Sequence, residues 1–168
     1  MISKLLSNID RRIIYIVLLV AIGFPIATGW TVKPARLPAG EKLFKVVESI
    51  NTEKPSLSLI AMDFGPGTHA ENQPQTEVIV EHLLRKRLRF AVFSIVAISE
   101  PFLNTIPEHV IKRLMKENAN EKWEYGVDWV NLGYKPGGEL FIQALARSDN
   151  LAEFFKKDAF GNELERLA

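Results

Sequence analysis

Residues 90–98, FAVFSIVAI, form an almost wholly apolar run that is rich in β-branched and aromatic side chains. A strand with one solvent-exposed face alternates apolar and polar residues, whereas an unbroken apolar run is typical of a strand covered on both faces. Such strands occur mainly in parallel sheets that have helices on either side. The stretch therefore predicts a buried central strand and an α/β fold.

The segments on either side of this strand alternate between strand-like and helix-like patterns. We expect two further strands, over residues 57–64 (LSLIAMDF) and 128–134 (DWVNLGY), and three helices, over residues 74–87, from Thr105 to about Asn118, and over 139–146. This order implies right-handed crossovers and a mostly parallel sheet with helices on both faces. The predicted fold class is α/β, with a small three-layer Rossmann-like or flavodoxin-like domain. Because three strands are few for this class, either a partner contributes a further edge strand or proteins of this kind normally have a longer domain.

Shorter patterns predict the remaining elements. Thr105 and Glu108 have the spacing of a capping box, with Pro107 in the first turn of the helix. Trp123 and Tyr125 precede the third strand in a polar stretch and could form an exposed contact surface. We also expect an amphipathic helix over 41–51, a short helix over 150–157 and a turn over 160–162.

A second apolar run, residues 13–30 (IIYIVLLVAIGFPIATGW), directly follows Arg11 and Arg12 and contains no charged residue. About 18 residues at 1.5 Å rise give roughly 27 Å of helix, close to the hydrocarbon thickness of a bilayer. A buried core helix normally keeps a polar stripe, but only Tyr15 interrupts this run before Pro25. The run therefore predicts a transmembrane helix, so residues 13–30 would contact the lipid bilayer as a partner.

A cleaved secretory signal is the alternative for this run, with residues 1–12 as its basic region and residues 27–29 as a small-residue cleavage site. We favour an uncleaved signal anchor, because the run is longer than the roughly 7 to 15 apolar residues typical of a signal peptide. Cations flank both ends, but Arg11 and Arg12 lie directly beside the run. We therefore expect a single-pass protein of the cell membrane, with a cytoplasmic N-terminus and an extracytoplasmic C-terminal domain.

This interpretation divides the chain into four parts. A short tail (1–12) precedes the transmembrane helix (13–30), and a linker (31–40, TVKPARLPAG) leads to an α/β domain (41–168). The two prolines and one glycine of the linker favour an extended conformation. The C-terminal part is long enough to form one compact domain with its own core.

Composition excludes several classes of function. The chain has 21 basic and 20 acidic residues, so its formal net charge is +1 and nucleic acid is not an expected partner. It contains no cysteine, which excludes disulfides, thiolate catalysis and zinc–thiolate sites. None of its three histidines has the spacing of a metal-binding motif. We therefore predict no metal site and no cofactor.

Three loops at the carboxyl ends of the predicted strands carry the candidate site, because ligands of open α/β sheets gather at this edge. If these loops form a site, Asp63, His69 and Glu100 are the catalytic candidates, because their side chains could act as acid and base or hold a divalent cation. Ligand-binding candidates are residues whose backbone amides, hydroxyl or charge suit an anion: Gly65, Gly67, Thr68, Lys135, Gly137 and Gly138. Each loop also has a structural interpretation, in which Asp63 caps a turn and the glycines allow tight turns.

A dense basic cluster, residues 85–89 (RKRLR), follows the first predicted helix of the domain. Cations at a helix C-terminus complement the helix dipole and keep the surface soluble. The alternative is a contact with anionic lipid headgroups or an acidic partner.

Two resemblances follow from these motifs. Residues 63–68, DFGPGT, resemble the first phosphate loop of the actin and sugar-kinase superfamily, D-x-G-x-[GS]-[TS]. In that superfamily the loop joins two strands of a hairpin, whereas residues 72–76 here lead into a helix. The anchor, this motif and residues 128–138 (DWVNLGYKPGG) together resemble single-span bacterial membrane proteins that have no assigned activity. The second resemblance covers most of residues 56–146 and implies no reaction and no site residue.

Two functions remain from different classes. The first, which we favour, is a membrane-anchored α/β domain that acts as a binding or assembly component of a bacterial envelope complex, with a protein partner or a second copy of itself. The second is a membrane-anchored enzyme or sensor of an anionic, perhaps phosphorylated, small molecule at the strand ends. The second predicts that Asp63, Glu100, Lys135 and Gly137 face one cavity.

Overall fold

The computed structural model describes residues 10–30, 37–54 and 56–164 of the chain. The chain divides into two units, Met1–Phe44 and Lys45–Ala168, and each is described by itself. The first unit contains helix α2 (Arg11–Thr28) and the first part of helix α3 (Pro38–Ser49). The second contains a three-stranded sheet with its helices.

Helix α2 has well-defined caps at both ends. Asp10 caps its start, where Oδ1 accepts a hydrogen bond from the Arg12 amide at 3.0 Å. At its end Gly29 adopts a left-handed φ of 62°, and the Trp30 amide donates to the Pro25 carbonyl at 3.0 Å. This is the geometry of a Schellman motif, which explains why the helix stops at Thr28 rather than at residue 30 as expected.

No residue of α2 is buried in the structure, and the helix is long and apolar enough to cross a membrane. The helix begins at Arg11, so it includes two residues of the predicted tail 1–12, whose residues 1–9 lie outside the described part. Residues 31–36 of the predicted linker also lie outside it. Residues 38–40 already belong to α3, because Pro38 has the backbone geometry that suits a first helical turn.

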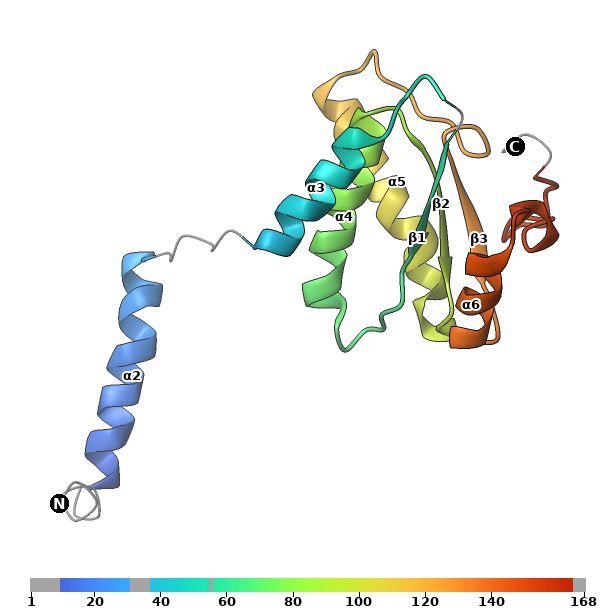
Figure 1. Cartoon of the computed structure of the whole chain (residues 1–168). Helices are drawn as coiled ribbons and strands as arrows, with labels where there is room; N and C mark the ends of the chain where they lie inside the picture. The colour runs from blue at the N-terminus through green and yellow to red at the C-terminus, as the bar shows by residue number, and fades with distance from the viewer. Residues whose placement is uncertain (1–9, 31–36, 55, 165–168) are drawn as a thin grey trace. The chain divides into compact units, whose positions relative to one another are not determined.

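The sheet contains β1 (Leu57–Ala61), β2 (Arg89–Ser94) and β3 (Trp129–Tyr134), all parallel and in the order β1-β2-β3 (Figure 1). The predicted parallel sheet with residues 90–94 in its central strand is therefore confirmed. Strand β2 ends four residues earlier than predicted. The Ser94 hydroxyl accepts a hydrogen bond from the Val96 amide at 2.9 Å, and the chain turns into the short 3-10 helix η1 (Ala97–Ser99).

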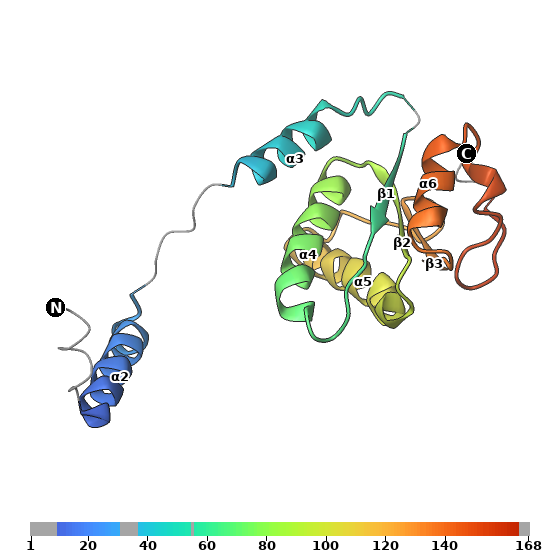
Figure 2. The ribbon, with the colours of Figure 1, turned by 60° about the horizontal axis from the view of Figure 1, so that its bottom comes forward.

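Helices α4 (His69–Arg85) and α5 (Glu100–Glu117) cover one face of the sheet, whereas α6 (Glu139–Arg147) lies on the other (Figures 1 and 2). The strand order explains this arrangement. Both crossovers step in the same direction, from β1 to β2 and from β2 to β3, and right-handed crossovers in one direction place their helices on one face. Helix α6 follows the last strand and covers the opposite face.

Each face of the sheet has its own apolar core, and alternate residues of β2 contribute to each. Phe90 and Val92 belong to the core under α4 and α5, whereas Ala91 and Phe93 belong to the core under α6. The second core also contains aromatic rings from α6 and the C-terminal segment: Phe141, Phe154 and Phe155. The two cores together explain why β2 is buried along its whole length after Arg89.

The predicted capping box at Thr105 is wrong. Helix α5 begins at Glu100, directly after η1, and Thr105 lies inside it with its hydroxyl bonded to the Pro101 carbonyl at 3.0 Å. Pro101 occupies the first turn, where a missing amide hydrogen costs nothing. Helix α4 likewise starts at His69, five residues before the predicted start.

The exposed aromatic surface predicted at Trp123 is also wrong, because this side chain is only 8% exposed. Its indole Nε1 donates to the Leu84 carbonyl at 3.2 Å, which fixes the ring under the end of α4. The predicted helix 150–157 is reduced to the 3-10 turn η2 (Leu151–Glu153). The predictions of β3 and of a helix that begins at Glu139 are confirmed.

Candidate functional site

The carboxyl ends of the three strands are joined by hydrogen bonds through Ser94. The Asp63 carboxylate follows β1, and its Oδ1 accepts from the Ser94 hydroxyl at 2.8 Å and from the Ile95 amide at 2.9 Å. The Lys135 amide follows β3 and donates to the Ser94 carbonyl at 2.7 Å. Asp63 therefore caps the turn after the neighbouring strand, which is the structural interpretation of a strand-terminal aspartate.

The charged groups of Asp63 and Lys135 have different contacts. The Asp63 carboxylate bonds to Ser94 and Ile95 at the end of β2. The Lys135 Nζ lies 5.5 Å from the ring centroid of Phe155, in the core under α6. Burial lowers the pKa of Lys135 below its ordinary value. The two residues follow strands that have β2 between them, and among the described residues they form no ion pair with each other.

Besides Asp63, the loop between β1 and α4 holds three of the predicted residues, and a fourth, His69, is the first residue of α4. Gly65 packs against Ile98, since a Cβ atom at Gly65 would lie 3.1 Å from its Cγ2. Gly67 has open space around it. The Thr68 hydroxyl makes no capping bond to α4, although its carbonyl accepts the amides of the first helical turn. The His69 ring lies 4.9 Å from the ring of Phe102, in a half-buried contact.

Gly137 and Gly138 shape the entry into α6. Their φ angles of 111° and 54° are in the region that favours glycine, and a Cβ at Gly137 would lie 3.4 Å from the Cβ of Phe141. Gly138 is the N-terminal cap and provides no side chain to the free amides of the first turn. Glu100 is exposed in the first turn of α5. The expectation of one cavity that gathers Asp63, Glu100, Lys135 and Gly137 stays a prediction.

A cavity of about 300 Å³ lies at the other end of β3, beside the C-terminal segment. Its lining includes Tyr125, Val127, Val130, Asp158 and Leu164, none of which was predicted as a site residue. The chain continues beyond this lining into residues that the structure does not describe.

Two of the polar groups that line this cavity, Tyr125 and Asp158, are bonded to each other. Asp158 is 7% exposed, and its two carboxylate oxygens accept from Tyr125, Phe160 and both nitrogens of Asn162 at 2.8 to 2.9 Å. Burial alone would raise the pKa of Asp158, but the hydrogen bonds from Asn162 and Tyr125 lower it overall. Burial, and then the bond to Asp158, raise the pKa of Tyr125. The hydrogen bonds of Tyr125 and Asp158 therefore support a structural role for these two side chains.

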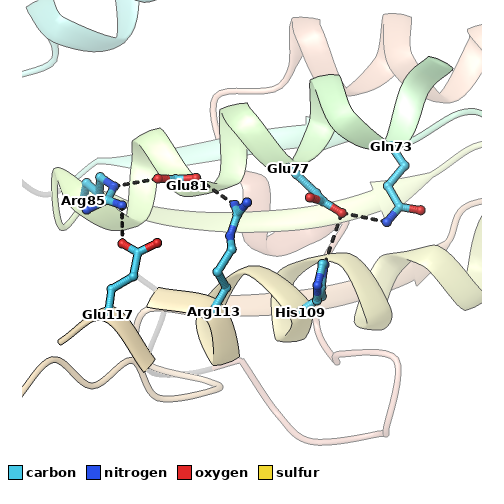
Figure 3. Close-up of polar contacts among 7 residues, drawn as sticks. All are labelled: Gln73, Glu77, Glu81, Arg85, His109, Arg113 and Glu117. Atoms are coloured by element: carbon cyan, nitrogen blue, oxygen red, sulfur yellow. Dashed lines mark hydrogen bonds and ion pairs between the residues drawn. The ribbon is translucent and has the colours of Figure 1, made fainter. Parts of the chain in front are cut away.

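The basic cluster 85–89 is largely engaged within the protein. Arg85 contacts Glu81 at 2.7 Å and Glu117 at 2.8 Å, which links α4 to α5 (Figure 3). Lys86 donates to the Glu48 carbonyl at 2.8 Å, and the Arg87 guanidinium lies 4.6 Å from the ring centroid of Trp123. These contacts favour the structural interpretation of the cluster.

Within residues 10–30, 37–54 and 56–164, no group of three or more histidine or acidic side chains is placed to hold a metal ion. Comparisons of the chain with protein-family models, with curated proteins and with solved structures found no match. Function must therefore be inferred from the arrangement of the chain's own residues.

Proposed function

We propose that this protein is a membrane-anchored α/β domain that serves as a binding or assembly component of a bacterial envelope complex. The observation that carries the proposal is helix α2, which has 18 residues, a mean hydropathy of 1.8 and no buried side chain. At 1.5 Å per residue its length is about 27 Å, which matches a bilayer core. Outside a bilayer, such a helix would expose a large apolar surface to water.

Two features of α2 support an anchor over a cleaved signal. The helix continues through Ala27 and Thr28, where the alternative has its cleavage site, and it ends in a Schellman motif at Gly29. Arg11 and Arg12 lie in its first turn, which supports a cytoplasmic N-terminus and an extracytoplasmic domain.

The finer fold class that we propose for the domain is Rossmann-like. Three parallel strands in sequential order, with both crossover helices on one face, correspond to one half of that fold. In a complete Rossmann fold, ligands bind where the strand order reverses, beside the first strand. In the part of the chain described here, the strand order β1-β2-β3 does not reverse. This supports a protein-binding role over a nucleotide site at the centre of the sheet.

Membrane fractionation of the full chain tests the anchor. We expect the wild-type protein to stay in the membrane pellet after washing with alkaline carbonate. Leu18→Lys combined with Leu19→Lys should release it, because each lysine at the centre of a span costs about 2.5 to 3.5 kcal/mol. Val78→Lys, at an apolar position of α4 that is 67% exposed, is the matched control and should remain in the pellet. Release of the wild-type protein would overturn the proposal.

Orientation has a separate test. A reporter that is active only in the cytoplasm, fused after Ala168, should be inactive. Strong reporter activity would place the domain in the cytoplasm and exclude an envelope role outside the membrane.

The alternative function, an enzyme or sensor of an anionic small molecule, has one observation in its favour. Gly138 leaves the first-turn amides of α6 without a side-chain cap, and Lys135 precedes Gly138 by three residues. Thermal shift of the detergent-solubilised full chain against inorganic phosphate, nucleotides, sugar phosphates and divalent ions tests it. A shift with an anion that is lost in Gly138→Asp would support the alternative, and no shift with any of them would exclude it.

A further inference from the structure

The two edges of the sheet differ in how they are covered. Beside β3, the Ala159 amide donates to the Asn131 carbonyl at 2.8 Å, and Tyr125 bridges to Trp129, so other segments occupy this edge. β1 is the opposite edge strand, and its residues are half-buried or, at Ala61, exposed. Within the described residues, nothing pairs with its outer side.

The direction of each backbone group in β1 follows from the parallel ladder. Met62 donates its amide to the Phe93 carbonyl of β2 at 2.9 Å. Backbone groups of successive strand residues point to opposite sides, so the even-numbered residues bond to β2. The amides and carbonyls of the odd-numbered residues, Leu57, Leu59 and Ala61, therefore point outward at the free edge.

These outward groups are self-complementary. In an antiparallel pair of two β1 strands centred on Leu59, Leu59 faces Leu59 of the second copy and Leu57 faces Ala61. All three residues then form hydrogen-bonded pairs, and every outward amide and carbonyl of both strands obtains a partner. A two-fold axis through Leu59 closes the pair, as symmetric dimers require.

Charge also favours this arrangement. Residues 56–62, SLSLIAM, contain no charged residue, so no like charges would face each other across the edge. The edge also lacks the lysine or bulge with which exposed edge strands usually prevent pairing. The antiparallel pair brings Lys54, before β1, toward Asp63, after β1 of the second copy. A parallel pair would instead bring Lys54 toward Lys54.

We propose that β1 of this protein pairs antiparallel with β1 of a second copy, about Leu59, to form a continuous six-stranded sheet. The inference rests on the proposed function in one respect. Anchoring in one bilayer raises the effective concentration of the copies, which favours a modest interface.

Cysteine cross-linking in the full chain tests the register, since the native sequence contains no cysteine. Facing Cα atoms of a hydrogen-bonded pair lie about 5.5 Å apart, within the range that a disulfide spans. We expect mild oxidation of Leu59→Cys in lipid nanodiscs to give a covalent dimer. Leu57→Cys, on the same face of the same strand, should not, because its two copies would lie about 14 Å apart.

A mixture of Leu57→Cys and Ala61→Cys chains provides a positive test of the same register. These two residues face each other, so the mixture should give the mixed disulfide. No cross-link at Leu59, or equal cross-linking of Leu59→Cys and Leu57→Cys, would overturn the proposal.

A proline variant tests the backbone pairing without a thiol. Ala61→Pro removes an outward amide hydrogen but no bond to β2, so the domain should fold and become monomeric by light scattering in detergent. Ala61→Ser keeps the amide and should remain dimeric. Circular dichroism checks that Ala61→Pro is folded, and a folded variant that is still dimeric would overturn the proposal.

Carbonate washing and Leu59→Cys cross-linking of the same membrane preparation distinguish a failure of this inference from a failure of the proposed function. A chain that stays in the carbonate pellet but gives no Leu59 cross-link contradicts only the dimer. A chain that is released by carbonate but cross-links at Leu59 contradicts only the membrane anchor.

Discussion

The Tyr125 hydroxyl donates a hydrogen bond to Oδ2 of Asp158 across 2.9 Å, and this contact joins residues that lie 33 positions apart. It holds the C-terminal segment against β3, together with the bond from the Ala159 amide to the Asn131 carbonyl. The segment in turn brings Phe155 into the core under α6. The buried Asp158 carboxylate therefore helps to hold the C-terminal segment against the sheet, on the face that α6 covers.

Tyr125→Phe should destabilise the domain by about 2 kcal/mol, because Asp158 loses a donor to a buried charged acceptor. The ring and its contact with Trp129, at a centroid distance of 4.9 Å, would remain. Tyr134→Phe is the matched control, since Tyr134 is 39% exposed and its hydroxyl has no described partner. Chemical denaturation of both variants measures the difference, and equal stabilities would contradict the assigned role.

The same pair predicts how stability depends on pH. The folded pKa of Asp158 is lowered, so its stabilising contribution is present above the ordinary value of 3.8 and is lost as pH falls below it. The folded pKa of Tyr125 is raised, so its contribution is present below the ordinary value of 10.0 and is lost as pH rises above it. Thermal unfolding of wild type and Tyr125→Phe across pH should show that the variant lacks the loss of stability that Tyr125 causes in wild type above pH 10.0.

Ser99→Ala should cost about 3 kcal/mol. The buried Ser99 hydroxyl accepts from the Phe64 amide at 3.1 Å and donates to the Phe64 carbonyl at 2.8 Å, so its removal leaves two buried backbone groups unpaired. Ser49→Ala is the control, because this exposed hydroxyl bonds only one carbonyl of its own helix. A cost for Ser99→Ala as small as that of the control would show that water replaces the lost bonds.

Much of the fold could be predicted because its signals are local. The almost wholly apolar run that begins at Phe90 indicates a covered strand, and Gly137 with Gly138 marks the start of α6. The start of α5 was missed because Thr105 carries a capping pattern, whereas the helix actually continues from the 3-10 turn that ends at Ser99. A local pattern predicts where a helix can begin, and the preceding turn decides where it does.

The candidate site was harder to predict because its contacts link distant segments. The aspartate at position 63 was identified from its place after a strand, but its partners Ser94 and Ile95 come from the next strand end. Asp158 begins a turn with Gly161 and Asn162, a pattern that could have suggested a capping aspartate. Nothing local identifies Tyr125 as its partner.

The contact between α4 and α5 predicts a salt-dependent stability (Figure 3). The Glu81 carboxylate contacts Arg85 and Arg113 at 2.7 Å each, so Glu81→Gln should lower the free energy of unfolding by up to about 1 kcal/mol at low salt. The loss should shrink in about 1 M salt, where the Debye length is about 3 Å. Glu108→Gln, from the more exposed pair with Lys112 at 3.3 Å, is the control and should have a smaller effect. A loss that is independent of salt would contradict an electrostatic role for Glu81.

Lys135→Met separates a structural role of Lys135 from a ligand-binding role. Burial lowers the folded pKa of Lys135, so its charge reduces stability below that pKa and the penalty fades as pH rises toward the ordinary value of 10.5. Methionine keeps the apolar contact with Phe155 without the charge, so the variant should be at least as stable as wild type at pH 7 and should lose this pH dependence. Lys112→Met, at a side chain that is 72% exposed, should change neither property.

A clear loss of stability in Lys135→Met would show that attraction between the ammonium and the Phe155 ring outweighs the cost of burial. An anion-induced thermal shift in wild type that disappears in a stable Lys135→Met would instead assign Lys135 to a ligand site.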